Sequence, residues 1–481
     1  MIIKNKIFIV LGLILISVFF PGVDNTVSAK CLSTEVVGIS GTTSTNKISR
    51  TTRRRHRRRY IPPKRMKYPK EFNSVSDTLL AKGVHYKKIV WGGKYKHYFH
   101  VIELNLDSSN VYLKTLKAKN TNTGLSKLQE IVQNYDSLFI DSILVAVNAN
   151  FWRAYSNHPI GPTICDGELI EMRTHKNWTS CFIDSKSHMF IDNFFINGRL
   201  LTADNKIFEI DYVNRRKDSN GVVLYNQFAG NVVPYISSSS IADEIKDALD
   251  QAVADAEFAD STDLELDSAG LVKEVLAMKQ LSNMEFNIYK SACDYVTGPA
   301  VNKETKAVVK NLKLGVVDMP LNGFVVSYGA NANINNLPKP GDTIIVKFSS
   351  NVHDSIVFYN SVSGSPRLIR EGKAKHEAAS EGLSSRRFIN MQLPRTAIGT
   401  SKDKNKIYIV VVESSALKHR KVGASLWNLT KIMQKLGAYD AMNLDGGGSS
   451  LMIIGGKNVL SPGKPDASRR ISVGLGVILD R

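Results

Sequence analysis

The residues that could do chemistry gather near the C-terminal end, where Asp445 is followed by Gly446-Gly447-Gly448-Ser449-Ser450. Glycine has no side chain and readily adopts positive φ angles, so consecutive glycines can present several backbone N–H groups to one anion. These residue types indicate an anion-binding loop with a carboxylate at its start. A tight turn without a ligand is the alternative that the glycines alone leave open.

The segment before this loop has the pattern of a helix followed by a strand. Ser425 precedes apolar residues at helical spacing and Gly437 closes the run, which predicts a helix with a serine N-cap and a glycine C-cap. The short apolar run over 441–444 predicts a strand that ends at Asp445. The elements would therefore deliver the carboxylate directly to the glycine loop.

Elsewhere the pattern predicts short strands and few helices. Residues 98–106 and 111–116 are strand-like and are joined by a polar turn, which predicts a β-hairpin. A helix over about 125–135 and a buried strand over 143–148 are expected to follow. Apolar residues at helical spacing among many acidic residues predict a helical insertion over 238–312.

Two segments in a fixed order resemble the phosphodiester glycosidase family. They are Leu393-Pro394-Arg395-Thr396-Ala397-Ile398-Gly399 and, later, Asn443-Leu444-Asp445-Gly446-Gly447-Gly448-Ser449-Ser450. Further matches are Asn148 before Phe151-Trp152, the turns at Gly161 and Asp166-Gly167, the segment Ser363-Gly364-Ser365-Pro366, and Arg469. Ala149 and Asn150 replace two glycines that the family has near the expected site, and Glu413-Ser414 replaces its Asp-Gly. These replacements are expected to affect substrate preference.

The resemblance implies hydrolysis of the bond between a sugar's anomeric carbon and a phosphate oxygen, through an oxocarbenium-like state. It implies Asp445 as base or nucleophile and Glu413 as a second carboxylate. The substrate-binding residues that it implies are Arg395, Thr396 and Arg469 for the phosphate, Gly446, Gly447, Gly448 and Ser449 as an anion nest, and Asn148 for a sugar hydroxyl or acetamido group. Since the phosphate leaving group has a second pKa of about 6, cations that hold its charge can replace a general acid.

No metal-binding motif accompanies these residues. We expect no cofactor, with a cation held by oxygen ligands beside Asp445 as the alternative. His100 and His158 lie outside any recognisable motif, so a packing or surface role is expected for both.

The chain has 481 residues, 43% of them hydrophobic and 22% charged, with a mean hydropathy of −0.14. These values exclude wholly disordered, collagen-like and polytopic membrane proteins. The formal net charge is +19, but residues 30–70 hold thirteen basic residues against Glu35 alone. The remaining chain is mildly basic, so we expect no nucleic acid as a partner.

The N-terminal segment has the pattern of an export signal. Lys4 and Lys6 precede an apolar run that ends in Val27-Ser28-Ala29, which predicts a signal peptide over 1–29 and a secreted or envelope-associated protein. An uncleaved membrane anchor is the alternative. Residues 30–75 have the composition of a disordered basic linker rich in Arg and Pro. This linker is either a solvated spacer or an arm that binds an anionic envelope polymer, and the oligomeric state is left open.

Export bears on the cysteines Cys31, Cys165, Cys181 and Cys293. An oxidising compartment would permit disulfides, and a bridge between Cys165 and Cys181 is one possible pairing. Buried free thiols are the alternative.

These observations predict an α+β (mixed α/β) protein, with one catalytic domain over 76–481 whose mixed sheets are flanked by helices. The predicted function is hydrolysis of a glycosyl 1-phosphodiester of N-acetylglucosamine type in an envelope or extracellular polymer. Two alternatives are a phosphodiesterase that breaks the P–O bond and a non-catalytic module that binds glycosyl phosphates.

Overall fold

The computed structural model describes residues 71–92, 96–138, 142–153, 156–234, 245–246, 249, 268–414, 423–460 and 469–480. All of them belong to the unit Met66–Arg481. The predicted signal peptide, nearly all of the basic linker and Cys31 lie outside these residues. Strand β1 (Asn73–Ala81) begins within the last residues assigned to the linker, so the predicted boundary at 76 is slightly late. No helix in the described ranges combines the length and apolar character that a membrane span requires.

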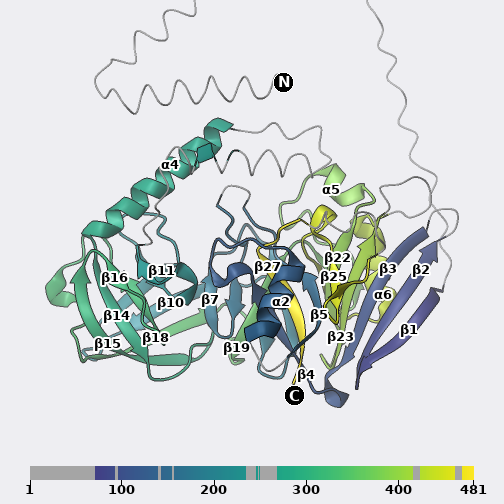
Figure 1. Cartoon of the computed structure of the whole chain (residues 1–481), viewed down its shortest axis with the longest axis horizontal. Helices are drawn as coiled ribbons and strands as arrows, with labels where there is room; N and C mark the ends of the chain where they lie inside the picture. Colours follow the sequence, from purple (N-terminus) through teal and green to yellow (C-terminus); the bar gives the residue numbers. More distant parts are fainter. Residues whose placement is uncertain are drawn as a thin grey trace, which may run out of the picture. The chain divides into compact units, whose positions relative to one another are not determined.

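The described residues are mostly β-structure, arranged as three sheets of five to eight strands, a closed barrel and one small strand pair (Figure 1). The α-helices in these ranges are α2 (Leu128–Leu138), α4 (Ser268–Met284), α5 (Arg386–Asn390) and α6 (Leu426–Leu436). The predicted α+β class is therefore confirmed only in part, because helices and sheets both occur but the described residues are mostly β rather than mixed sheets flanked by helices. Most apolar runs form strands that pair with strands from distant parts of the sequence, so sheets rather than helices cover much of the core.

The eight-stranded sheet holds most of the residues predicted for the site. Its strands, in spatial order, are β1, β2 (Val84–Gly92), β3 (Lys96–Asn105), β23 (Lys406–Glu413), β22 (Arg395–Thr400), β24 (Asp440–Asn443), β20 (Arg367–Arg370) and β21 (Lys373–Ala374). Helix α6 packs on one face through Leu426, Leu429 and Met433. As predicted, the Ser425 hydroxyl accepts from Asn428 N at its start, and Gly437 ends it with φ 97°.

A five-stranded sheet carries the other strand that leads to the site. Its order is β26 (Lys457–Asn458), β25 (Met452–Ile454), β5 (Ser142–Asn148), β27 (Val473–Leu479) and β4 (Val111–Lys117), and α2 packs on it through Leu128, Ile131 and Val132. The predicted hairpin between β3 and β4 is wrong, because the turn η1 (Leu106–Ser108) leads β4 into this second sheet. Strand β3 has β2 on one side and β23 on the other, so it has no free edge for β4.

A second five-stranded sheet has the order β7 (Glu168–Glu171), β6 (Thr163–Cys165), β19 (Phe358–Gly364), β8 (Thr179–Asp184) and β9 (Met189–Asp192). Cys165 and Cys181 lie on β6 and β8, with β19 between them, and both are buried free thiols. The bridge considered between them is therefore absent. Two strand spacings, about 10 Å, exceed the Cα separation that a disulfide can span.

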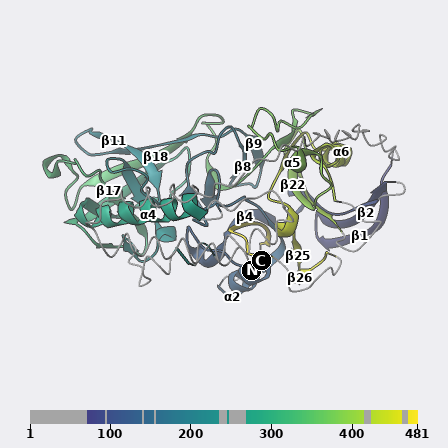
Figure 2. The ribbon, with the colours of Figure 1, turned by 90° about the horizontal axis from the view of Figure 1, so that it is seen from above.

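The barrel occupies the continuous stretch 196–350, between β9 and β19. Its strands, in spatial order, are β10 (Ile196–Leu201), β11 (Ile207–Val213), β12 (Val222–Tyr225), β17 (Gly323–Ser327), β14 (Tyr289–Tyr295), β15 (Glu304–Leu314) and β18 (Thr343–Ser350), with the small pair β13 (Val232–Val233) and β16 (Val317–Asp318) beside them. Helix α4 crosses over one end of the barrel, as Figure 1 and Figure 2 show together. The predicted helical insertion over 238–312 contains α4, but its last part forms β14 and β15, so the insertion is not helical throughout. Alternating burial along β15 shows the two-residue period of a strand there.

Candidate active site

Asp445 follows β24 by two residues and is anchored through its backbone. Its N–H donates to Ala149 O at 2.9 Å, and its carbonyl accepts from Asn148 Nδ2 at 2.6 Å. Asn148 is the last residue of β5. The predicted carboxylate therefore lies where the ends of two sheets meet, β24 from one sheet and β5 from the other.

Asn148 and Thr396 hold this junction together. The Thr396 hydroxyl donates to Asn148 Oδ1 at 2.7 Å, and Leu451 N donates to the same oxygen at 3.1 Å. Both side chains are fully buried. Both ends of the Asn148 amide therefore have protein partners, so Asn148 and Thr396 hold the Asp445 segment in position, and their predicted contacts with substrate stay predictions.

The glycine loop uses several of its own amides. Gly446 N donates to Asp445 Oδ1 at 2.8 Å, and Gly447 N donates to Pro394 O at 2.9 Å. Ser449 N donates to Gly446 O at 3.2 Å and closes the short turn η6 (Gly447–Ser449). The predicted nest of consecutive amides is therefore largely occupied by the loop itself, because the chain folds into a 3₁₀ turn there.

Two hydroxyls in the same loop are still available to a ligand. Ser449 and Ser450 are buried, and their Oγ atoms have no hydrogen-bond partner within the described chain. Gly447 has φ 63°, a left-handed conformation that glycine adopts without strain. A Cβ placed on Gly447 or Gly448 would meet nothing within 4 Å, so this side of the loop is open.

Arg395 is a buried cation beside the loop. It is 1% exposed, Nε donates to Ala424 O at 3.0 Å, and Nη2 donates to Phe388 O. Its guanidinium also lies 4.7 Å from the centroid of the Phe388 ring. No described carboxylate pairs with it, and burial lowers the pKa of Arg395 to about 10. A buried guanidinium without a protein counter-charge is a suitable partner for a bound anion.

Aromatic side chains surround these groups. The ring of Phe151 lies 6.3 Å from Phe388 and 5.4 Å from Trp178, measured between centroids. The guanidinium of Arg469 lies 5.0 Å from the Trp152 ring. The structure thus places both predicted arginines against aromatic rings. Phe388 and Trp178 were missed from the sequence, because no local pattern sets them apart from ordinary core aromatics.

Glu413 belongs to a buried polar chain. It is 6% exposed, and His100 Nε2 donates to its Oε1 at 3.0 Å. The other ring nitrogen of His100 is bonded to the Tyr86 hydroxyl at 2.7 Å, and burial and the Glu413 charge together raise the pKa of Tyr86. Strand β22 lies between β23, which ends at Glu413, and β24, which leads to Asp445, so the two strands are about 10 Å apart. His100, expected to serve only packing, is a partner of the predicted second carboxylate.

The described residues contain no group of three or more His, Cys, Asp or Glu side chains that could hold a metal ion. The oxygen-liganded cation considered beside Asp445 therefore has no cluster of such ligands in the part of the chain that the structure describes.

The C-terminal part of the chain matches a known family model over residues 298–478. This segment matches the phosphodiester glycosidases. The match covers β22, β24, the Asp445 loop and Arg469, so the predicted resemblance is confirmed there. The matched segment is less than half of the chain.

One curated relative and two solved structures add to this match. An N-acetylglucosamine-1-phosphodiester alpha-N-acetylglucosaminidase from Bos taurus is 31% identical over 107 residues, which are 21% of this chain and 20% of the relative. A hypothetical protein from Synechocystis has a TM-score of 0.55 at 19% identity, over 83% of this chain and 62% of that one. A putative exported protein from Burkholderia pseudomallei has a TM-score of 0.55 at 14% identity, over 85% of this chain and 97% of that one. The two structures show that the fold is shared.

Proposed function

We propose that the protein hydrolyses the bond between the anomeric carbon of a sugar and a phosphate oxygen in a glycosyl phosphodiester. The observation that carries this proposal is the set of unsatisfied groups beside Asp445. The Ser449 and Ser450 hydroxyls are buried without partners within the described chain, and the buried Arg395 has no carboxylate there. A phosphate would satisfy all three groups, since it supplies both negative charge and acceptor oxygens.

In the proposed reaction the carbon–oxygen bond breaks and the anomeric carbon becomes positively charged. Asp445 would either attack this carbon or activate the water that does so. The Gly446 N–H, bonded to Asp445 Oδ1 at 2.8 Å, orients the carboxylate for that role. Arg395 and the serine hydroxyls would stabilise the departing phosphate, so that little protonation of the leaving oxygen is needed.

The proposed substrate is an N-acetylglucosamine-type phosphodiester of an envelope or extracellular polymer. The activity named for the bovine relative supports this sugar, and the predicted signal peptide supports the location. Phe388 lies against Arg395, with Phe151 next to it, and Trp152 lies against Arg469, so a sugar ring beside either cation would meet aromatic side chains.

The test is hydrolysis of a phosphodiester panel, beginning with UDP-N-acetylglucosamine, in ¹⁸O-labelled water. We expect the wild type to release sugar that carries the label at its anomeric oxygen, and Asp445→Asn to release none. Asp403→Asn is the matched control, because Asp403 lies in the exposed turn between β22 and β23. Label in the phosphate would identify a phosphodiesterase, and an absence of turnover would favour a module that only binds glycosyl phosphates.

A further inference from the structure

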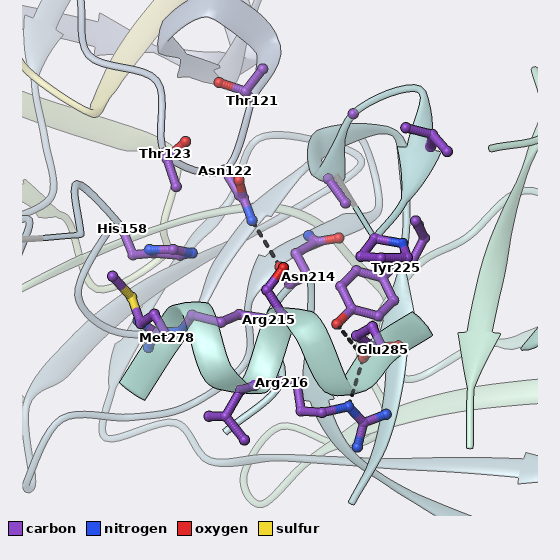
Figure 3. A pocket seen from close by; sticks show the side chains of 17 residues that line it. Thr121, Asn122, Thr123, His158, Asn214, Arg215, Arg216, Tyr225, Met278 and Glu285 are labelled. Atoms are coloured by element: carbon purple, nitrogen blue, oxygen red, sulfur yellow. Dashed lines mark hydrogen bonds and ion pairs between the residues drawn. The ribbon is translucent and has the colours of Figure 1, made fainter. Parts of the chain in front are cut away.

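A cavity of about 420 Å³ lies beside the barrel, apart from the residues assigned to the candidate active site. It is lined by the segment Thr121–Thr123, by His158, by the segment that joins β11 to β12, and by α4 (Figure 3). Its volume falls in the range of small-molecule sites, about 300–1,000 Å³. Two of its side chains carry unsatisfied polar atoms, and they differ in what they can bind.

His158 offers an acceptor to the cavity. It is 6% exposed, and its Nδ1 lies 2.9 Å from Ser156 O, so Nδ1 carries the hydrogen. Burial, together with the charge of Arg215, holds the pKa of His158 well below its usual value. The ring is therefore neutral, and Nε2 has a lone pair. This atom is buried without a partner among the described residues, so it lacks a donor such as a hydroxyl group.

Arg215 offers an unused hydrogen-bond donor, and its positive charge is only partly neutralised by the protein. Its Nε is buried without a hydrogen-bond partner in the described part of the chain, and its Nη2 lies 3.9 Å from Glu171. The same carboxylate also lies 3.7 Å from Lys217 Nζ, so one negative charge serves two cations. Arg153 adds positive charge within electrostatic range and Glu274 on α4 adds negative charge. Burial lowers the pKa of Arg215, and Glu171 opposes this shift.

The neighbouring Arg216 shows what a satisfied arginine looks like in the same cavity. Its Nε donates to Glu285 Oε1 at 2.6 Å, and its Nη1 donates to Gly221 O at 2.6 Å. The Tyr225 hydroxyl donates to the same Glu285 oxygen at 2.8 Å, as Figure 3 shows. Arg216 is therefore committed to the barrel, whereas Arg215 keeps donor capacity for a ligand.

One loop connects this cavity with the candidate active site. Ala149 O accepts the backbone N–H of Asp445, and Arg153 N donates to His158 O at 2.9 Å farther along the same loop. Trp152, whose ring contacts Arg469, forms an isolated antiparallel β-bridge through its backbone with Pro159, the residue after His158. A substrate that extends from Asp445 along this loop would reach the cavity.

We propose that this cavity is a second subsite, which binds another sugar-phosphate unit of the same substrate chain. Arg215 donates to the phosphate, and His158 Nε2 accepts from a hydroxyl of the sugar. A free phosphate would leave the His158 acceptor unsatisfied, whereas a sugar phosphate supplies both kinds of group. The choice of ligand rests on the proposed function, but the pairing of a donor cation with a neutral acceptor does not depend on it.

The test is calorimetric titration of the full chain with glucose 1-phosphate, inorganic phosphate and glucose. Arg215→Gln is expected to weaken the binding of both phosphate-containing probes about tenfold or more. His158→Phe is expected to weaken the binding of glucose 1-phosphate alone, because inorganic phosphate does not use the acceptor. Arg199→Gln is the matched control, since Arg199 lies on the exposed surface of the same barrel, paired with Glu209. Arg215→Lys, which keeps the charge but removes the Nε donor, replaces Arg215→Gln as the test if circular dichroism shows that the latter does not fold.

Unchanged affinity for glucose 1-phosphate in both the His158 and the cation variants would overturn the second subsite. The labelled-water experiment reports separately on the proposed function. Arg215-dependent binding without any hydrolysis would leave the subsite standing and remove the catalytic proposal. Hydrolysis with no Arg215-dependent binding would support the proposed function and overturn the second subsite.

Discussion

Replacing Arg395 by methionine is expected to lower activity strongly while changing the stability of the free protein little. Burial lowers the pKa of Arg395 from 12.5 to about 10, which corresponds to roughly 3 kcal/mol against the charged form. The hydrogen bonds to Ala424 O and Phe388 O and the contact with the Phe388 ring together stabilise it by about 3 kcal/mol. The cost of burying the charge and the stabilisation by these contacts nearly cancel, because no described carboxylate adds a further favourable interaction.

Methionine suits this substitution because its stem can follow the path of the arginine stem beside Gly446. The Ala424 carbonyl would also keep its bond from Leu393 N at 3.3 Å. Urea unfolding should therefore give a free energy of unfolding within about 1 kcal/mol of the wild type. In a phosphodiester assay, kcat/KM should fall by about 10²–10³, as expected when one preorganised donor to a developing anion is lost. Inorganic phosphate should raise the stability of Arg395→Met less than that of the wild type, because the variant keeps only the phosphate site proposed at Arg215.

Arg367→Met is the matched control for a buried arginine that does have carboxylate partners. Arg367 lies on β20 of the same sheet, with its guanidinium 3.1 Å from Asp192 and 2.6 Å from Asp440. Removing it leaves the buried Asp440 without its cation, although Asp192 keeps Arg370 at 3.1 Å, and should cost about 3–5 kcal/mol. If Arg395→Met were destabilised as strongly as Arg367→Met and kept the full wild-type stabilisation by phosphate, Arg395 would be a structural residue and the anion-site reasoning would be refuted.

Three further outcomes are expected. Ser449→Ala should leave the free energy of unfolding unchanged or raise it by up to about 1 kcal/mol, because it removes a buried hydroxyl without a described partner, and should lower kcat/KM about tenfold. Gly448→Ala should lower activity without loss of stability in thermal unfolding, because its Cβ would point into the open side of the loop. Gly298→Ala is the control, since a Cβ there is equally uncrowded but lies outside the site, and it should change neither activity nor stability. Lys117→Met should flatten the pH dependence of urea unfolding between pH 7 and 10. Burial lowers the pKa of Lys117 from 10.5 to about 7, so in this window the unfolded wild type binds the extra proton and stability rises with pH, by at most ~1.4 kcal/mol per pH unit. A wild-type slope equal to that of the variant would contradict this assignment.

Local sequence signals predicted the elements that deliver Asp445. Ser425 and Gly437 mark the ends of α6 because a cap depends only on residues within one turn of it. The strand before Asp445 was likewise visible as a short apolar run. The path of the chain after β3 was not visible, because pairing with β23 depends on residues more than three hundred positions away. A polar turn after an apolar run fits a hairpin and a change of sheet equally well.

The sequence predicted the charged groups of the site but not the residues that hold them in position. Asp445 and Arg395 stand in segments that resemble the family, so their importance could be inferred from residue type and order. The Asn148 amide is hydrogen-bonded to the Thr396 hydroxyl and to the Asp445 carbonyl. These bonds depend on a contact between two sheets, which no local pattern encodes. The roles of His158 and Arg215 were hidden for the same reason, since each gains its character from burial against distant segments.

The residues that replace two family glycines gain a meaning from this geometry. Ala149 and Asn150 are both buried, and Asn150 Nδ2 donates to Thr163 Oγ1 at 2.8 Å while its Oδ1 accepts from Ser363 N at 3.0 Å. Asn150 thus ties the start of the loop to β6 and β19, in the sheet that adjoins the barrel in sequence. Because Ala149 O holds the Asp445 backbone and the other end of the loop carries His158, the same bonds position groups at both proposed subsites. The replacements expected to affect substrate preference thus act on the position of this loop, Ala149 through its backbone carbonyl and Asn150 through its side-chain amide, and a substrate that spans Asp445 and Arg215 would have to match that position.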